Sequence, residues 1–266
     1  KYNGHTLRLD FNLTQDGRHR LFARGNYQHD TEAGEPQWPD TPGTKKWSHP
    51  IGYMVQHDWT VSSSLINTLR YGVTRQAFSQ QGDSNQNAIQ FRFVFEPYEY
   101  SRTLSRTTPV YNIVDDVSWR KGNHTFGFGT NIRIIRNERV SYANSYDAAY
   151  VNPSYYEGSG AVLTDPIIDA AGNLSDLRAA VAAVIGRYSQ YSGSFNFDRD
   201  GSILSVGEGV GRTFATEEYE LYAQDSWRVV PSLTLTYGLR WGLNRPVYES
   251  TGFQVKPTTS LGDYFE

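Results

Sequence analysis

Histidine, aspartate and tyrosine are the residue types whose spacing in this sequence could support chemistry. The stretch Asp198-Arg199-Asp200-Gly201 resembles the start of a calcium-binding loop but lacks the later glutamate of such a loop, so a polar loop tip is favoured over a calcium site. No nucleophile elbow, phosphate loop or His-Glu-x-x-His motif occurs. The sequence therefore predicts no catalytic residue, no resident metal and no cofactor. The histidines lack metal-ligand spacing: they are His5, His19, His29, His49, His57 and His124.

Tyrosines are concentrated between about residues 137 and 216. Clustered exposed aromatic rings can stack on a sugar or peptide ligand, and they can equally pack a loop against itself. Four of these residues are the substrate-binding candidates: Tyr146, Tyr150, Tyr155 and Tyr156.

The composition favours β-structure and excludes several classes of function. Aromatic residues make up 14% of the chain and hydrophobic residues 38%, a mixture that suits pleated sheets better than helical bundles. A net charge of −3 without a lysine or arginine run disfavours a nucleic-acid partner. The absence of cysteine excludes disulfides and thiol chemistry. The longest apolar stretch, 179–185, is too short for a membrane-spanning helix.

Alternation of apolar and polar residues predicts about eight strands in four hairpins. In the first strand Leu7, Leu9, Phe11 and Leu13 alternate with polar residues, the period of a strand with one apolar face. The predicted strands occupy about 6–14, 20–28, 51–61, 65–74, 113–119, 125–134, 218–228 and 233–244.

The connections alternate strictly in length. Tight turns near 15–17, 61–64, 120–123 and 230–232 alternate with long loops at about 29–49, 80–108 and 137–216. Outer-membrane barrels place short turns on the periplasmic side and long loops outside, whereas sandwiches mix the two. We therefore predict an all-β fold, an antiparallel transmembrane β-barrel.

Each face of the strands carries a second pattern. Trp59, Trp119 and Trp227 each precede a tight turn on the apolar face, as expected of an aromatic girdle at the membrane interface; the alternative is three tryptophans of an ordinary core. On the opposite face we expect Arg70, Arg133 and Arg240 to point into the lumen; in a soluble sandwich that face would simply be solvated.

The longest loop contains one helical pattern. Leu174, Leu177, Val181, Val184 and Ile185 recur at helical spacing, with Asn173 or Ser175 as N-cap and Gly186 as the stop. This short helix could act as a lid or docking element, or could only fold the loop on itself.

Two motifs resemble a known family. Glu218–Arg228, with the sequence EYELYAQDSWR, followed by Leu233–Arg240, with the sequence LTLTYGLR, resembles the barrel of TonB-dependent receptors, most of all the Oar-like group with an N-terminal carboxypeptidase-regulatory-like domain. The segments 122–129 and 19–24 support the resemblance, which covers nearly all strands and little of the loops.

The resemblance implies a 22-stranded barrel filled by a plug, in the bacterial outer membrane, importing an unknown ligand with energy from the TonB complex. This sequence departs from that pattern: about eight strands, no plug-like segment, no TonB box and no terminal aromatic strand are present. We therefore expect residues 1–266 to form an internal part of the barrel domain, in contact with outer-membrane lipid.

Two alternatives remain open at this point. The first is a complete eight-stranded outer-membrane barrel that acts as an adhesin or anchor. The second is a secreted soluble β-protein that binds carbohydrate through the tyrosine-rich loop. A soluble protein would enclose its apolar strand faces, including Leu7, Phe128 and Leu235, in its interior.

Overall fold

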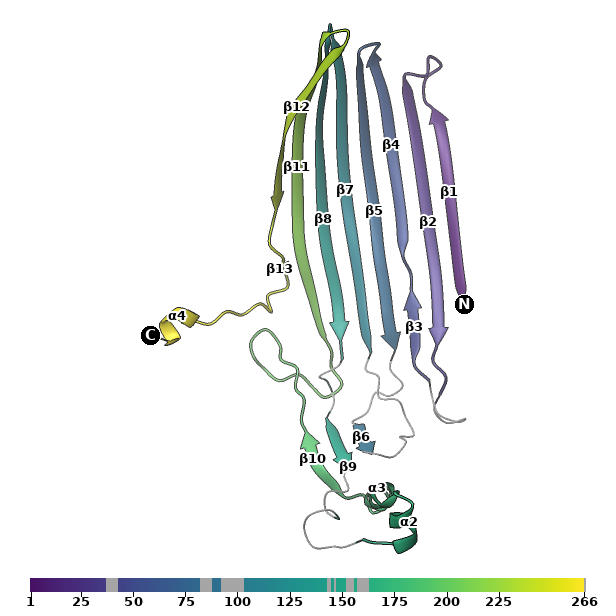
Figure 1. The fold of residues 1–266 in the computed structure, drawn as a ribbon, viewed down its shortest axis with the longest axis vertical. Helices are drawn as coiled ribbons and strands as arrows, with labels where there is room; N and C mark the ends of the chain where they lie inside the picture. The colour runs from purple at the N-terminus through teal and green to yellow at the C-terminus, as the bar shows by residue number, and fades with distance from the viewer. Residues whose placement is uncertain are drawn as a thin grey trace.

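A single open sheet of long antiparallel strands dominates the molecule, which confirms the predicted all-β class (Figure 1). The computed structural model describes residues 1–36, 43–81, 88–91, 103–142, 145, 147–151, 156 and 163–265. The strands are β1 (Tyr2–Asn12), β2 (His19–Ala33), β3 (Lys45–Ser48), β4 (Ile51–Ser62), β5 (Leu65–Gln81), β6 (Ala88–Phe91), β7 (Leu104–Lys121), β8 (His124–Ser141), β9 (Ala148–Val151), β10 (Tyr188–Ser192), β11 (Val210–Val230), β12 (Leu233–Asn244) and β13 (Tyr248–Glu249). The helices are α2 (Pro166–Ala170), α3 (Leu174–Val184) and α4 (Leu261–Phe265).

The large sheet follows the chain order, with each long strand beside the next. Its path runs β1, β2, β3 with β4, β5, β7, β8, β11 and β12. The four predicted tight turns lie together at one end of the sheet, the upper end in Figure 1, and the long connections lie at the other.

β3 and β4 form one interrupted strand between β2 and β5. The interruption falls at His49 and Pro50, because proline has no backbone N–H to donate to a ladder. The Pro50 carbonyl still accepts a hydrogen bond from the Gln28 amide at 3.0 Å, so the sheet remains continuous. β3 falls within the predicted loop at about 29–49, because it follows a stretch rich in proline, glycine and acidic residues that masks its strand pattern.

The strand register divides the sheet into an apolar face and a polar face. Residues that are paired across strands share a face, and successive residues alternate. One row of the apolar face consists of Leu9, Ala23, Val55, Tyr71, Ile113, Ile132, Tyr219 and Leu243. The polar row beside it consists of Arg8, Arg24, Met54, Gly72, Asn112, Arg133, Glu218 and Asn244.

The apolar face of the sheet is uncovered by any second layer in the described part of the chain. Leu7, Phe128 and Leu235 are 63%, 42% and 45% exposed. Among the described residues, five hydrophobic side chains are buried, and four of these are alanines. An exposed apolar surface of this extent is not stable in water, so it requires a nonaqueous environment or a protein partner.

The strands extend further toward the long loops than the sequence analysis predicted. β7 begins at Leu104 rather than near 113, β8 continues to Ser141, and β11 begins at Val210. These extensions carry polar residues on both faces, so apolar–polar alternation does not mark them. The predicted loops at 80–108 and 137–216 are correspondingly shorter.

The loop end carries a small second sheet and two helices. β6, β9 and β10 form a three-stranded sheet, in which β6 and β9 are parallel. The predicted helix is present as α3, with Asn173 as N-cap residue and Gly186 in the left-handed conformation after its end (φ 67°). Its buried residues are Ala179 and Ala182, whereas Val184 of the predicted apolar stripe is 87% exposed. α2 was not predicted; Asp165 caps it by accepting hydrogen bonds from Ile167 and Ile168.

Within the described residues, no helix combines the length and the apolar character needed to span a membrane.

Candidate functional site

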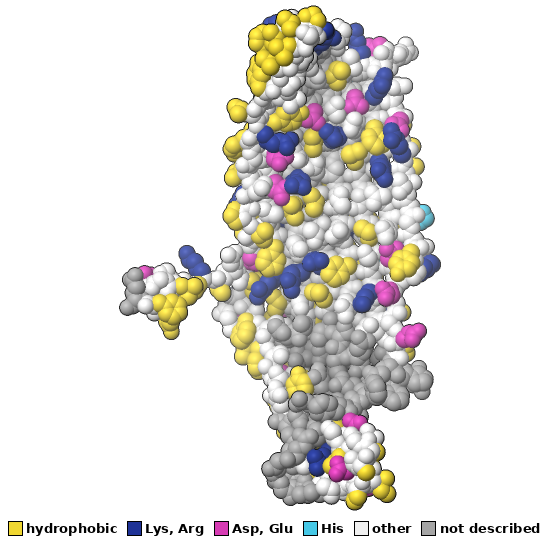
Figure 2. All heavy atoms as spheres, in the orientation of Figure 1, with side chains coloured by type: hydrophobic (Ala, Val, Ile, Leu, Met, Phe, Trp, Pro, Cys, Tyr) yellow, Lys and Arg dark blue, Asp and Glu magenta, His cyan; other side chains and the backbone are white. Residues whose placement is uncertain are grey.

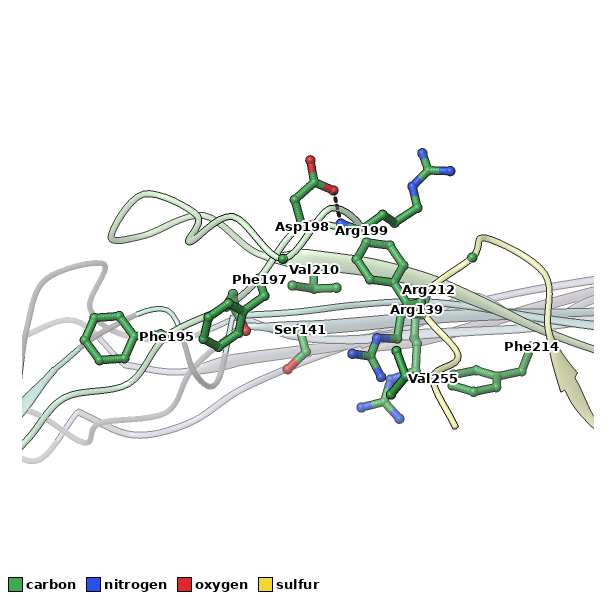
Figure 3. Close-up of a pocket in the computed structure, with 14 residues that line it drawn as sticks. Arg139, Ser141, Phe195, Phe197, Asp198, Arg199, Val210, Arg212, Phe214 and Val255 are labelled. Atoms are coloured by element: carbon green, nitrogen blue, oxygen red, sulfur yellow. Dashed lines mark hydrogen bonds between the residues drawn. The ribbon is translucent and has the colours of Figure 1, made fainter. Parts of the chain in front are cut away.

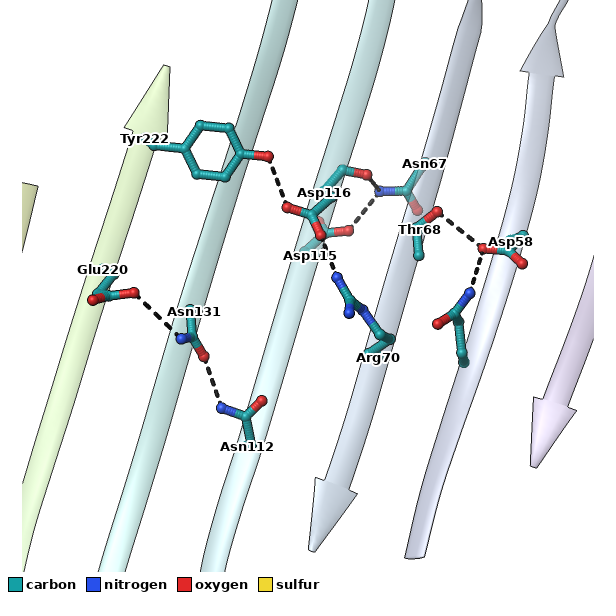
Figure 4. Close-up of polar contacts among 11 residues, drawn as sticks. Asp58, Asn67, Thr68, Arg70, Asn112, Asp115, Asp116, Asn131, Glu220 and Tyr222 are labelled. Atoms are coloured by element: carbon teal, nitrogen blue, oxygen red, sulfur yellow. Dashed lines mark hydrogen bonds and ion pairs between the residues drawn. The ribbon is translucent and has the colours of Figure 1, made fainter. Parts of the chain in front are cut away.

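The polar face carries a hydrogen-bonded network that runs across the long strands (Figure 4). Its centre is Asp116 on β7, which accepts hydrogen bonds from Arg70 on β5 at 2.6 Å and from the Tyr222 hydroxyl on β11 at 2.8 Å. On β8, Asn131 accepts from Asn112 at 2.7 Å and donates to Glu220. These contacts connect β5, β7, β8 and β11 across the polar face.

The three predicted lumen arginines all lie on this polar face. Arg70 forms the ion pair with Asp116, and Arg133 forms one with Glu218 on β11. Arg240 on β12 places its guanidinium 5.9 Å from the centre of the Tyr222 ring. Whether this face borders a lumen remains a prediction.

Gly129 makes room for the tyrosine of this network. A Cβ on Gly129 would lie 2.6 Å from the Asp116 carboxylate and would overlap the Tyr222 ring. A glycine in a strand interior marks such close approaches, because any side chain would fill the space that the ring occupies. Only the register shows that Gly129 of β8 faces Tyr222 of β11.

Sequence reasoning missed Asp115 and Asp116, and their adjacency was the available signal. Neighbouring residues of a strand point to opposite faces, so one of two consecutive aspartates must lie on each face. Asp116 lies on the polar face, whereas Asp115 lies on the apolar face and accepts a hydrogen bond from Asn67 at 2.5 Å.

The three predicted girdle tryptophans lie on the apolar face near the tight turns. They are 36% to 40% exposed, and each ring stacks or packs on an aromatic ring of a neighbouring strand. Their partners are His19 for Trp59, Phe126 for Trp119 and His124 for Trp227, at centroid distances of 5.5, 5.4 and 5.4 Å.

These tryptophans occupy successive rows of the register rather than one row. The row of Trp59 crosses β8 at Phe128, that of Trp119 at Phe126, and that of Trp227 at His124. From one tryptophan to the next, the position therefore shifts by two residues for every two strands. This is about 6.6 Å along the strand direction for about 9.6 Å across the sheet. Such a step places the rings at one level if the strands tilt by about 35°, close to the tilt of transmembrane barrel strands.

We expect the girdle tryptophans to report a shallow depth in lipid. In vesicles of brominated phospholipids, replacing Trp227 by phenylalanine should remove fluorescence that is quenched best by bromines near the headgroups. Trp241 of β12 is the matched control, because it lies on the same apolar face but far from the tight turns. It is paired with Leu221, which lies six residues from Trp227 along β11. The W241F variant should instead remove fluorescence that deep bromines quench best. Equal depths for the two residues would contradict the girdle.

The four tyrosine candidates are not gathered into one site by the described residues. Tyr150 lies in β9, half-buried and paired with Gln190 of β10. Tyr156 is also half-buried, and Tyr146 and Tyr155 lie outside the described residues. Their role in binding remains a prediction.

The aspartates of the possible calcium loop are engaged with their own turn. Asp198 accepts a hydrogen bond from the Arg199 amide at 2.7 Å, and Asp200 accepts two from Ser202. Gly201 has a φ of 85°, which a tight turn requires. Among the described residues, no group of three or more histidine or carboxylate side chains is arranged to hold a metal ion.

A cavity of about 520 Å³ opens where the large sheet meets the loops (Figure 3). Arg139 on β8 and Arg212 on β11 line it together with Phe214, and the loop residues Phe197 and Phe253 complete its wall. A second cavity of about 390 Å³ also includes Arg139 and Phe214. Both volumes lie in the range of small-molecule sites.

Glu249 holds the loop that carries Phe253. Its carboxylate accepts hydrogen bonds from the amides of Thr251 at 2.8 Å and Phe253 at 2.7 Å. Burial alone would raise the pKa of the Glu249 carboxyl, but these hydrogen bonds outweigh it and lower the pKa to about 2.

We expect the loop at Phe253 to loosen in acid. A carboxyl with a lowered pKa stabilises the folded loop fully above its ordinary pKa of 4.5, and this contribution disappears as the pH falls through about 2. Pepsin should therefore spare the bond beside Phe253 at pH ~4 and cleave it near pH 2. The E249Q variant should be cleaved at both pH values, whereas D263N, in α4, should behave as wild type. Resistance of E249Q at pH ~4 would contradict this role.

Comparison with known proteins agrees with this geometry. A search of curated proteins finds no match to the sequence. Among solved structures, the chain is similar to the crystal structure of the outer membrane transporter YddB from Escherichia coli, with a TM-score of 0.50 and 10% identity. The similarity covers 93% of this chain and 28% of that chain, so this chain spans just over a quarter of the transporter's length. Residues 1–258 match the outer membrane beta barrel domain family, and the chain therefore belongs to that family and to the bacterial outer membrane.

Proposed function

We propose that this chain forms part of the barrel wall of a TonB-dependent outer-membrane receptor that imports a ligand. The observation that carries the proposal is the division of one single-layer sheet into an exposed apolar face and a networked polar face. In a barrel wall the first face meets lipid and the second borders a water-filled or plugged lumen. In this arrangement Trp59, Trp119 and Trp227 mark the periplasmic interface, and Arg70, Arg133 and Arg240 line the lumen.

The free edges of the sheet support a larger barrel rather than a small adhesin. Within the described residues β1 pairs only with β2, and β12 pairs only with β11 and not with β1. An eight-stranded barrel would close by pairing its first and last strands, because unpaired backbone groups are prohibitive in hydrocarbon. Further strands therefore belong between β12 and β1 in the intact wall.

The TonB dependence of the proposal rests on the resemblance of β11 and β12 to TonB-dependent receptors. The experiment compares cells that carry the full-length gene with cells that lack it, in backgrounds with and without TonB. Compounds lost from the culture medium are quantified by mass spectrometry.

We expect at least one compound to disappear from the medium about tenfold more slowly when either the receptor or TonB is removed. An uncoupler of the proton gradient should have the same effect. Unchanged depletion in every background, or depletion that depends on the receptor but not on TonB, would contradict the proposal.

A further inference from the structure

Three arginines stand side by side on the polar face near the loop end of the sheet. Arg106 of β7 is paired with Arg139 of β8, and Arg139 is paired with Arg212 of β11. We call these residues the arginine row. Figure 2 shows Lys/Arg side chains next to one another on this face, at the level where the sheet gives way to the loops.

The register makes this row electrostatically costly. Residues directly opposite one another in an antiparallel pair have Cβ atoms about 4.5–5.5 Å apart, and like charges at such positions destabilise the sheet. Here Arg139 faces one cation on each side. A row of this kind needs a compensating negative charge.

The described residues provide no such charge. None of the three arginines forms an ion pair with a carboxylate of the described chain. Asp30 lies on the same register row but three strands from Arg106, or about 14 Å. Glu249, opposite Phe214, is engaged by Thr251 and Phe253.

Two arginines nearer the middle of the polar face do have carboxylate partners. Arg70 and Arg133, on the central strands, each have a carboxylate partner on a neighbouring strand, Asp116 and Glu218. The arginine row differs from these two arginines, because it places three cations side by side with no carboxylate partner among the described residues. It is a local excess of positive charge beside the two cavities.

Aromatic rings hold the two ends of the row. The Arg106 guanidinium lies 4.6 Å from the centre of the Phe78 ring, and the Arg212 guanidinium lies 5.4 Å from that of Phe253. Such cation–π contacts restrict the side chains without neutralising them.

Arg139, between them, lines both cavities, as does Phe214. In Figure 3 the guanidinium groups of Arg139 and Arg212 lie on the same side of the sheet, whereas the side chains of Arg199 and Asp198 point away from them.

We propose that the arginine row binds an anionic ligand that carries an aromatic or apolar group, with the carboxylate or phosphate on the arginines and the apolar part against Phe214. Guanidinium groups suit this task because their planar N–H donors match both oxyanions. The row lies on the face opposite the apolar rows, so lipid headgroups do not reach it. This inference rests on the proposed receptor function and specifies the class of ligand.

The test uses the purified full-length protein in detergent and isothermal titration calorimetry. Phenyl phosphate is the probe that carries both features; inorganic phosphate carries only the charge and phenol only the ring. We expect phenyl phosphate to bind most tightly, about tenfold more tightly than phosphate, and phenol not to bind measurably. Its affinity should fall as salt is raised, because salt screens exposed charges.

Variants assign the binding to the row. R139Q should weaken phenyl phosphate binding about tenfold, as expected for loss of one charge-assisted hydrogen bond, and R106Q/R139Q/R212Q should abolish it. R120Q is the matched control, since Arg120 is exposed on the same face of β7 at the opposite end. Heat-modifiable migration on a gel verifies that every variant is folded.

The proposal is overturned if wild-type protein does not bind phenyl phosphate, if folded R139Q binds it as tightly as wild type, or if R120Q loses as much affinity. Binding in detergent needs no energy source, so it is independent of the medium-depletion experiment. TonB-dependent depletion without phenyl phosphate binding would refute the anion site alone. Binding without TonB-dependent depletion would refute the receptor function alone.

Discussion

Replacing Leu221 by arginine is expected to lower the free energy of unfolding of the full-length protein by about 2–4 kcal/mol. Leu221 is 52% exposed on the apolar face of β11, midway between the polar residues Glu217 and Asp225 on the same face. These eight residues span about 26 Å along the strand, or about 22 Å at a tilt of about 35°. Leu221 thus lies near the middle of the bilayer, where a charge is most costly.

The matched control is Gln224→Arg, which adds the same charge three residues away on the polar face. There the guanidinium remains in water, so we expect a change below about 1 kcal/mol. Urea unfolding in lipid vesicles, followed by tryptophan fluorescence, measures both variants. Equal effects at the two positions would show that the apolar face does not meet hydrocarbon, and the transport proposal would fail with it.

Gly129→Ala is expected to cost about 1–3 kcal/mol, the usual effect of inserting atoms into a filled space. The new Cβ would displace the Tyr222 ring and separate its hydroxyl from Asp116, leaving Arg70 as the remaining partner of that carboxylate. The same unfolding experiment measures the loss.

Two further variants distinguish crowding from a general effect of alanine. Gly25→Ala places its Cβ where nothing lies within 4 Å, so we expect it to be neutral or slightly stabilising. In the double variant Gly129→Ala/Tyr222→Ala the ring is gone, so the added cost of the alanine at 129 should disappear. A cost of Gly129→Ala that is undiminished in the Tyr222→Ala background would contradict the packing explanation.

The membrane-spanning strands were largely predictable, because the pattern that marks a strand lies in residues that are neighbours in the sequence. Alternation assigns each residue of a strand to one face without knowledge of its neighbours, and short turns force consecutive strands to pair. Leu7, Phe128 and Leu235 were assigned to the exposed apolar face on this basis, and the structure confirms that they are exposed. The predicted ends of β7, β8 and β11 at the loop side were wrong, because polar residues lie on both faces of the sheet there and apolar–polar alternation is lost.

The candidate site was predicted only in part, for the same physical reason. Arg70 and Arg133 could be assigned to the polar face, but their partners Asp116 and Glu218 lie 46 and 85 residues away in sequence. Arg106, Arg139 and Arg212 fell within predicted loops, so nothing in the sequence suggested that they form a row.

The sequence by itself determined which segments cross the membrane as strands and which side chains share a face, because both follow from a period of two residues along one chain. The tertiary structure alone decided which residues of different strands stand opposite one another. Register across a long loop depends on the packing of the whole sheet, and a shift of one residue would move every side chain to the other face. The contact of Tyr222 with Asp116 over Gly129, and the arginine row beside its two cavities, are consequences of that register.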